Sequence, residues 1–376
     1  MLARLGQSIP SHTTNASGVS PYNARMRWLR MLHYLSEMGG HSTIRRSGFS
    51  AAPLCFTLSA AFLASGCKGP QSALDPAGPQ AKQLSDLFWW MSAGTAVVWF
   101  GMIALTIYAI RVRPEPAKNA RRARMLIVFG GAAVPTTVLT VLLVYGLSIL
   151  PPMVARAPEG SLKIKVVGEQ WWWRVQYRKD GQLVALANEI RIPVDRPIQF
   201  ELVSSNVIHA FWIPSLGGKR DLIPGRTNLL VLTSTRTGLF RGVCAEYCGT
   251  SHALMSFVVE VMDENAFNRW LDSQTAEAQE PQTGIARRGR NLFLQNGCGA
   301  CHTVRGTSAA GVIGPDLTHL GSRYSLGAGI LTNDLPAIEH WISYPDRIKP
   351  AVHMPAFRML PREDRQALAA FLEGLK

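Results

Sequence analysis

Cysteine is scarce in this chain, and the few cysteines present are grouped. Of six cysteines in 376 residues, four fall in two short motifs, Cys244 with Cys248 and Cys298 with Cys301. A disulfide framework is typical of short chains dense in cysteine, so this distribution indicates cofactor ligation instead.

Acidic residues are also few, 25 against 39 basic ones, which leaves a net charge of +14. The basic excess lies in residues 1–66, 67–150 and 284–376, whereas residues 151–283 carry 14 basic and 14 acidic side chains. No contiguous basic face interleaved with aromatic residues remains, and we therefore expect no nucleic-acid partner.

Residues 1–66 are predicted to be a leader. Arg45 and Arg46 precede a short apolar run, residues 49–63, and small residues then lead to Cys67. This order is typical of an export signal, and the run is too short to span a bilayer. We predict either lipidation of Cys67, as in a bacterial lipoprotein, or ordinary cleavage near it.

Two long apolar runs follow a short outer segment, residues 67–86. Residues 87–110 and 126–150 are each long enough for a transmembrane helix at about 1.5 Å per residue. The loop between them carries six basic residues and one acid, Glu115. The positive-inside rule places such a loop in the cytoplasm and both flanks outside. A buried helical hairpin of a soluble protein is the alternative, which the length of both runs disfavours.

Short strand-like runs replace the apolar ones between residues 151 and 272. They alternate in hydrophobicity and are separated by Gly, Pro, Asn and Asp, which predicts an antiparallel sandwich or barrel. The runs cover residues 162–167, 171–177, 190–192, 198–203, 207–213, 228–232 and 257–261.

A dense group of soft donors closes this region. The twelve residues from Cys244 to Met255 hold two thiols, the His252 imidazole and a thioether. Copper prefers these donors, and two cysteines four apart can bridge a pair of ions. A structural zinc site is the alternative, because His209 could complete a tetrahedron of two Cys and two His. Met255, a poor zinc ligand, and the lack of a second CxxC knuckle nearby favour copper.

A polar stretch of low hydrophobicity, residues 273–283, is predicted to be a linker to a last domain, residues 284–376. There Cys298-Gly-Ala-Cys301-His302 follows a predicted helix over residues 285–296. C-x-x-C-H is the attachment signature of c-type haem, with two thioether bonds and an axial His302. A CxxC redox pair or a zinc knuckle is the alternative, disfavoured by the adjacent histidine.

The second axial ligand of this haem is predicted to be Met354. Pro355 fixes the loop beside it, and thioether ligation raises the haem potential. Met359, His340 and His353 are the competing candidates.

The chain ends in a predicted helix over residues 361–374. Leu368, Phe371 and Leu372 recur at helical spacing. We expect this face to pack against Gly289 and Phe293 of the helix over residues 285–296.

Three further motifs, in order before the copper motif, complete a family resemblance over roughly residues 70–272. They are Gly168-Glu-Gln-Trp171, residues 207–214 and residues 219–226. The chain closely resembles subunit II of the haem-copper cytochrome c oxidases, with a cytochrome c fused at its C-terminus. This implies a multidomain membrane protein: a two-helix transmembrane hairpin, an all-β cupredoxin-like Greek-key domain and an all-α cytochrome c domain.

The resemblance also implies residue roles in a dinuclear copper (CuA) centre. Two copper ions would be bridged by Cys244 and Cys248, with His209 and His252 as terminal ligands, one for each copper. The remaining roles are axial ligation by Met255 and by the Glu246 carbonyl, magnesium binding at the subunit I contact by the Glu246 carboxylate, and electron uptake at an exposed Trp171.

The implied function is the uptake of electrons by a bacterial cytochrome c oxidase. Electrons would pass from an external cytochrome c or quinol–cytochrome c reductase through haem c and copper to subunit I, which reduces oxygen to water and pumps protons. Partners would be subunits I and III and the bacterial inner membrane, crossed twice, with both metal domains on the periplasmic face. This chain holds no oxygen-reducing site.

Three other functions are alternatives to this one. A stand-alone, membrane-anchored electron-transfer or copper-handling protein is the principal alternative. Nitrous oxide reductase would need a propeller domain for which the chain has no room, and a quinol oxidase subunit would have lost the copper ligands.

Overall fold

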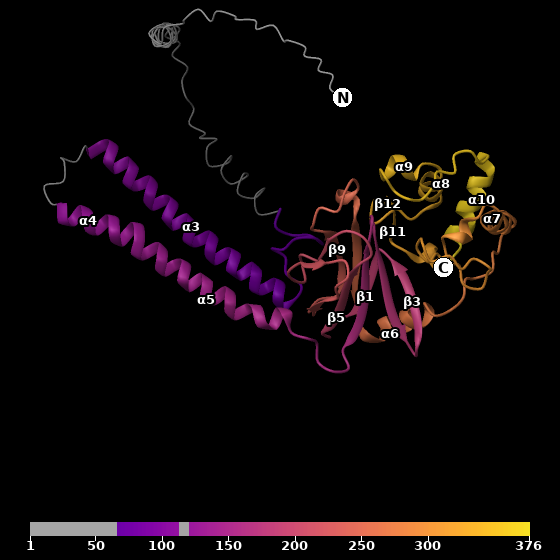
Figure 1. Cartoon of the computed structure of the whole chain (residues 1–376), viewed down its shortest axis with the longest axis horizontal. Helices are drawn as coiled ribbons and strands as arrows, with labels where there is room; N and C mark the ends of the chain where they lie inside the picture. Colours follow the sequence, from indigo (N-terminus) through magenta and orange to yellow (C-terminus); the bar gives the residue numbers. More distant parts are fainter. Residues whose placement is uncertain (1–65, 113–119) are drawn as a thin grey trace, which may run out of the picture. The chain divides into compact units, whose positions relative to one another are not determined.

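The computed structural model describes residues 66–112 and 120–376 (Figure 1). The predicted export signal over residues 49–63 lies outside the described residues, whereas Cys67 lies within them. The carbonyl of Cys67 accepts a hydrogen bond from the Ser72 hydroxyl at 2.7 Å.

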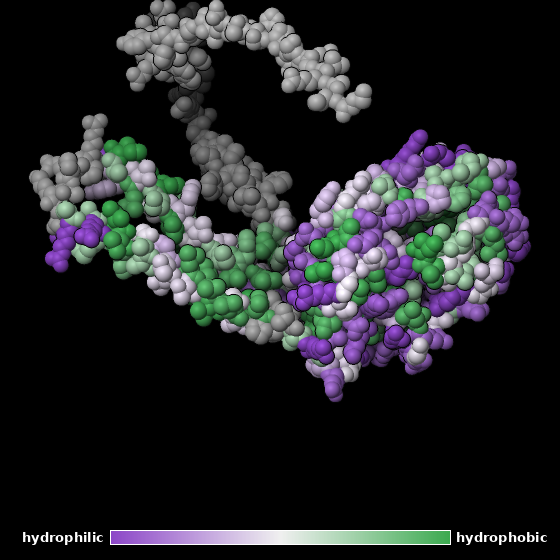
Figure 2. Space-filling model, viewed as in Figure 1, coloured by the Kyte–Doolittle hydropathy of each residue, from purple (hydrophilic) through white to green (hydrophobic). Residues whose placement is uncertain are grey.

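Two long apolar stretches of helix come first. They are α3, Pro79–Val112, and a continuous run of α4, Ala120–Val128, a π-helical turn, Phe129–Ala133, and α5, Val134–Val154. Pro79–Arg111 and Ala120–Leu150 are long and apolar enough to cross a membrane, and the most apolar window of each has no buried residue. Figure 2 shows hydrophobic residues along these helices and mostly hydrophilic residues on the visible face of the other domains. A helix that is apolar but uncovered is suited to lipid.

Helix α3 begins at Pro79 rather than at residue 87, because its first turn belongs to the β-rich domain. Ala77 and Ala81 are buried, and the Gln80 amide donates to the carbonyl of Val231 at 2.9 Å. These contacts hold residues 79–86 in the helix, although their polarity places them outside the apolar run.

The β-rich domain is a sandwich of two five-stranded sheets, ordered β3-β2-β1-β5-β8 and β4-β10-β9-β6-β7. Two neighbouring pairs, β1 with β5 and β4 with β10, run parallel, so the expectation of a purely antiparallel domain was wrong. The strands are β1 Leu162–Glu169, β2 Trp172–Lys179, β3 Gln182–Ala187, β4 Glu189–Pro193, β5 Ile198–Ser204, β6 His209–Trp212, β7 Arg220–Leu222, β8 Asn228–Leu232, β9 Gly238–Cys244 and β10 Ser256–Met262.

Aromatic side chains fill the space between the sheets. Phe211 and Phe257 stack with centroids 4.7 Å apart, and Trp173 meets Phe257 edge-on at 5.3 Å. A Cβ at Gly242 would lie 2.0 Å from the Phe257 ring, which explains a glycine within β9. Strands β3, β7 and β9 were not predicted. In β9, Gly238 and Gly242 interrupt the apolar alternation, and β7 is only three residues long.

The C-terminal domain is helical, as predicted, and follows α6, Glu264–Ser273. A Cβ at Gly289 would lie 1.9 Å from the carbonyl oxygen of Ala367, so the first and last helices touch backbone to backbone. Phe293 and Phe371 pack there with centroids 5.6 Å apart, which confirms the predicted crossing. The elements are α7 Gly284–Gln295, β11 Ser325–Leu326, β12 Leu331–Thr332, α8 Leu335–Ser343, α9 Pro345–Ile348 and α10 Arg362–Glu373.

The stretch predicted to be a linker is tied to this domain by two hydrogen bonds. The Ala278 amide donates to the carbonyl of Arg305 at 3.0 Å, and the Arg305 guanidinium donates to the carbonyl of Gln274 at 2.6 Å. Backbone groups of this polar segment therefore have partners 27 and 31 residues away in the chain.

Candidate copper and haem sites

The six predicted copper ligands converge at one end of the sandwich. His209 opens β6, Cys244 closes β9, and the loop to β10 supplies the others. The Cys244 Sγ lies 3.8 Å from His209 Nδ1, 3.8 Å from Cys248 Sγ and 3.2 Å from the Glu246 carbonyl oxygen, and the Cys248 Sγ lies 3.5 Å from His252 Nδ1 and 3.9 Å from Met255 Sδ.

The two buried thiols are coupled electrostatically. A hydrogen bond with the Cys248 thiol lowers the pKa of Cys244 to about 3, and the same bond together with burial raises the pKa of Cys248. One thiolate is therefore formed at neutral pH, and binding of a cation would release the second proton.

The donor set fits two copper ions better than one zinc ion. Closed zinc sites use four donors, whereas this loop and β6 offer six, including the Met255 thioether and the Glu246 carbonyl. Ligand atoms of His209, Cys244 and Cys248 all lie within 4.8 Å of one another. The identity of the metal stays a prediction.

Two residues to which the sequence assigned no role at the copper site orient His209: Asn206, and Gly168, which opens one of the family motifs. Its Nε2 lies 3.2 Å from Asn206 Oδ1, a partner that leaves Nδ1 for a metal. Gly168 also packs against the ring, where a Cβ would come within 2.7 Å of His209 Cδ2. For Asn206, its position three residues before His209 is the feature of the sequence that could have indicated this role.

Substitution of Gly168 by alanine is expected to weaken copper binding by about 10–100-fold, as loss of outer-shell support generally does. The added methyl group would displace the His209 ring. Copper content after dialysis against a graded chelator measures the effect. Gly284→Ala, whose Cβ meets nothing within 4 Å, is the matched control, and equal copper retention in both variants would contradict the expectation.

Trp171 contacts the copper loop directly but is not exposed. Its indole Nε1 donates to the carbonyl of Cys248 at 2.9 Å, and only 6% of its surface is accessible. The expectation of an exposed indole was therefore wrong for this chain. The His353 ring covers it, with centroids 6.4 Å apart.

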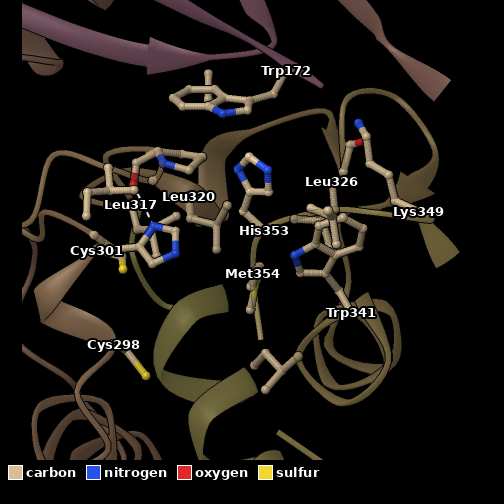
Figure 3. Close-up of a pocket in the computed structure, with 18 of the residues that line it drawn as sticks. Trp172, Cys298, Cys301, Leu317, Leu320, Leu326, Trp341, Lys349, His353 and Met354 are labelled. Carbon is tan, nitrogen blue, oxygen red and sulfur yellow. Dashed lines mark hydrogen bonds between the residues drawn. The ribbon is translucent and has the colours of Figure 1, made fainter. Parts of the chain in front are cut away.

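A cavity of about 380 Å³ lies around the C-x-x-C-H motif and is lined by residues of both the C-terminal domain and the sandwich. Figure 3 shows Cys298 and Cys301 on one side of this cavity and Met354 among the side chains that line it. The walls are largely apolar and include Phe293, Leu317, Leu320, Phe357 and Leu372. An apolar cavity with two thiols, an imidazole and a thioether at its walls fits a covalently attached haem.

His302 is prepared for iron by its surroundings. Its Nδ1 donates to the carbonyl of Pro315 at 2.8 Å, which leaves the Nε2 lone pair free, and burial lowers the pKa of the imidazole so that it is neutral. A Cβ at Gly314 would lie 2.5 Å from His302 Cε1, so only glycine permits this packing.

The four candidates for the second axial ligand of the haem differ in whether they line the cavity. Met354 and His353 both line the cavity, whereas Met359 is 73% exposed and neither Met359 nor His340 is among the lining residues. Met354 remains the predicted ligand, and His353 faces the copper domain through its contact with Trp171.

Comparison with known proteins gives matches to both domains. A family described as "Cytochrome C oxidase subunit II, periplasmic domain" matches residues 162–262, and the family "Cytochrome c" matches residues 286–376. The chain is 34% identical to cytochrome c oxidase subunit 2 of Alkalihalophilus pseudofirmus, over 83% of this chain and 93% of that protein. It is 30% identical to cytochrome c oxidase subunit 2 of Bacillus subtilis, over 84% and 94%.

One similar solved structure is the periplasmic domain of subunit II of cytochrome oxidase (CoxB) of Bradyrhizobium japonicum. The two sequences are 33% identical. The superposition covers 33% of this chain and 97% of that chain, with a TM-score of 0.30.

Proposed function

Because this chain belongs to the cytochrome c oxidase subunit II family, we propose that it receives electrons from an external donor and delivers them to subunit I of a bacterial oxidase. Haem c bound at Cys298, Cys301, His302 and Met354, and two copper ions bound by the copper loop and His209, would supply the one-electron chemistry. Subunit I would then reduce oxygen to water and pump protons.

One observation carries this proposal: Trp171 and Trp172, next to the copper loop, also line the cavity that holds the C-x-x-C-H motif. Electron tunnelling weakens steeply with distance, so two redox centres must be neighbours to exchange electrons quickly. The indole of Trp171 lies against His353 on one side and bonds to the Cys248 carbonyl on the other. This arrangement supports Trp171 as the residue through which electrons reach copper.

The membrane and partner assignments are part of the proposal. The chain is anchored by its two apolar helices, and we propose that both cross the bacterial inner membrane, with the metal domains on the periplasmic face. Subunits I and III would be partners, and the donor would be a cytochrome c or a quinol–cytochrome c reductase. Lipidation of Cys67 or cleavage near it would set the mature N-terminus.

A magnesium ion at the contact with subunit I is proposed at Glu246. Its carbonyl lies near Cys244, while its half-exposed carboxylate lies 3.6 Å from Lys219 Nζ. An exposed ion pair of this kind contributes little stability, so the carboxylate can exchange the lysine for a hard cation.

Absorption and electron paramagnetic resonance spectra of the air-oxidised full chain test the proposal. We expect low-spin haem c together with a mixed-valence signal split by two equivalent copper nuclei. Haem without a copper signal, and zinc in the metal analysis, would overturn it. Isolation without a many-helix haem subunit would favour the stand-alone electron carrier instead.

A further inference from the structure

A buried lysine joins the C-terminal domain to the copper loop. Lys349 is only 2% exposed, and its Nζ donates to the carbonyls of Leu254 and Gly327, each at 2.9 Å. Leu254 immediately precedes the predicted ligand Met255, whereas Gly327 belongs to the C-terminal domain. Burying an amine is unfavourable unless its hydrogen bonds are replaced, and here a partner from each domain replaces them.

The protonation of Lys349 does not decide whether these bonds form. Burial lowers the pKa of its amine to about 7. The neutral amine still has two N–H groups, enough to donate to both carbonyls.

Hydrogen bonds on both sides of Lys349 extend the contact. The Ser251 hydroxyl donates to the carbonyl of Pro350 at 2.5 Å, and the Ser256 hydroxyl and amide donate to the carbonyl of Ala328 at 2.7 and 3.2 Å. A Cβ at Gly329 would lie 2.4 Å from Ser256 Oγ. The turn between β11 and β12 therefore fits closely against the strand that follows the copper loop.

A second group of contacts lies farther from the loop. The buried Glu189 carboxylate accepts a hydrogen bond from the Tyr324 amide, and the Arg191 guanidinium lies 5.3 Å from the Tyr324 ring centroid. Arg174 donates to the carbonyls of Val312 and Ile313 at 3.0 and 3.2 Å. We call this set of contacts, together with those of Lys349, Ser251 and Ser256, the docking interface.

The docking interface surrounds the place where the haem cavity meets the copper domain. Trp172, His353, Met354 and Lys349 all line that cavity (Figure 3). The His353 contact with Trp171, whose indole bonds to Cys248, lies within the same interface.

We propose that Lys349 is a positioning residue that holds the haem-binding domain docked on the copper loop and so keeps His353 against Trp171. This rests on the proposed function, because docking matters only if electrons pass between the two domains. Fixing two redox domains in one geometry removes the orientational search that a loosely tethered pair repeats at each transfer.

Replacement of Lys349 by methionine in the full chain, assembled with its oxidase partners, tests the role. Methionine keeps an apolar stem of similar length and removes both hydrogen bonds. In the oxidised protein we expect the Ser256 and Tyr324 amides, which bond across the interface, to exchange hydrogen about 10-fold faster. The Val258 amide, which bonds to the Asn188 carbonyl within the sandwich, should exchange at the wild-type rate.

Electron transfer gives the second readout. After flash reduction, one electron leaves reduced haem c and reduces the oxidised copper centre, and we expect this rate to fall about 10-fold in Lys349→Met, with the loss of bonds that fix the geometry. Lys163→Met, which replaces an exposed lysine on β1, is the matched control and should leave rate and exchange unchanged.

Wild-type exchange and rate in Lys349→Met would overturn the proposal. If Lys349→Met does not assemble, Ser251→Ala replaces it as the test, because it removes the hydroxyl that bonds to Pro350. Amide exchange should then rise and the haem-to-copper rate should fall, each to a smaller extent. An unchanged exchange and rate in Ser251→Ala would also overturn the proposal. Absence of haem-to-copper transfer in the wild type would refute the proposed function instead, and amide exchange would still report docking.

Discussion

Replacing Cys248 by serine is expected to abolish the mixed-valence copper signal and to lower oxidase turnover by at least about 100-fold. Substitutions of residues that only support a metal ligand typically cost about 10–100-fold, and loss of a ligand should cost more. Cys248 lies within 4 Å of donor atoms of Cys244, His252 and Met255, so it connects both halves of the predicted centre. Serine is a harder donor and stays protonated at neutral pH, so it cannot bridge two copper ions.

The spectrum of the oxidised protein and turnover with the native donor measure this effect. Tyr247→Phe changes the same loop at a side chain that is 76% exposed, and should leave both unchanged. A Cys248→Ser protein that keeps the two-copper signal would show that Cys248 is not a bridging ligand. Loss of bound zinc without any change in spectrum would indicate the structural zinc site.

Truncation of the chain after Thr275 is expected to cause the second large loss of turnover. The sandwich has its own core, closed by Phe267 and Leu271 of α6, so copper binding should persist without the C-terminal domain. Turnover with the native donor at micromolar concentration should fall by at least about 100-fold, because even a freely tethered domain acts at an effective concentration near the millimolar range, and docking raises it further.

Turnover with a small artificial reductant that reaches copper directly provides the control for this truncation. It should persist, since removal of the C-terminal domain uncovers Trp171, which His353 covers in the full chain. Unchanged turnover with the native donor would refute a role for the fused haem. Loss of copper from the truncated chain would instead show that the C-terminal domain supports the copper loop.

The sequence by itself determined which residues are predicted to bind the two cofactors, because the donors of each predicted site lie close together in the chain. Cys244 to Met255 contains most of the predicted copper ligands within twelve residues, and Cys298 to His302 contains the predicted haem attachment within five. Apolar runs of bilayer length likewise identify the two anchoring helices without tertiary information.

Only the tertiary structure decided how these sites are supported and connected. Asn206 and Gly168 orient His209 through contacts that the hydropathy pattern does not show. The parallel pairing of β1 with β5 joins strands that are separated in the chain by three others, β2, β3 and β4. The contact of Lys349 with Leu254 spans 95 residues. A pattern of residue types records local periodicity and the spacing of ligand donors. Contacts between distant residues depend instead on how strands and domains meet, and no short stretch of sequence encodes that.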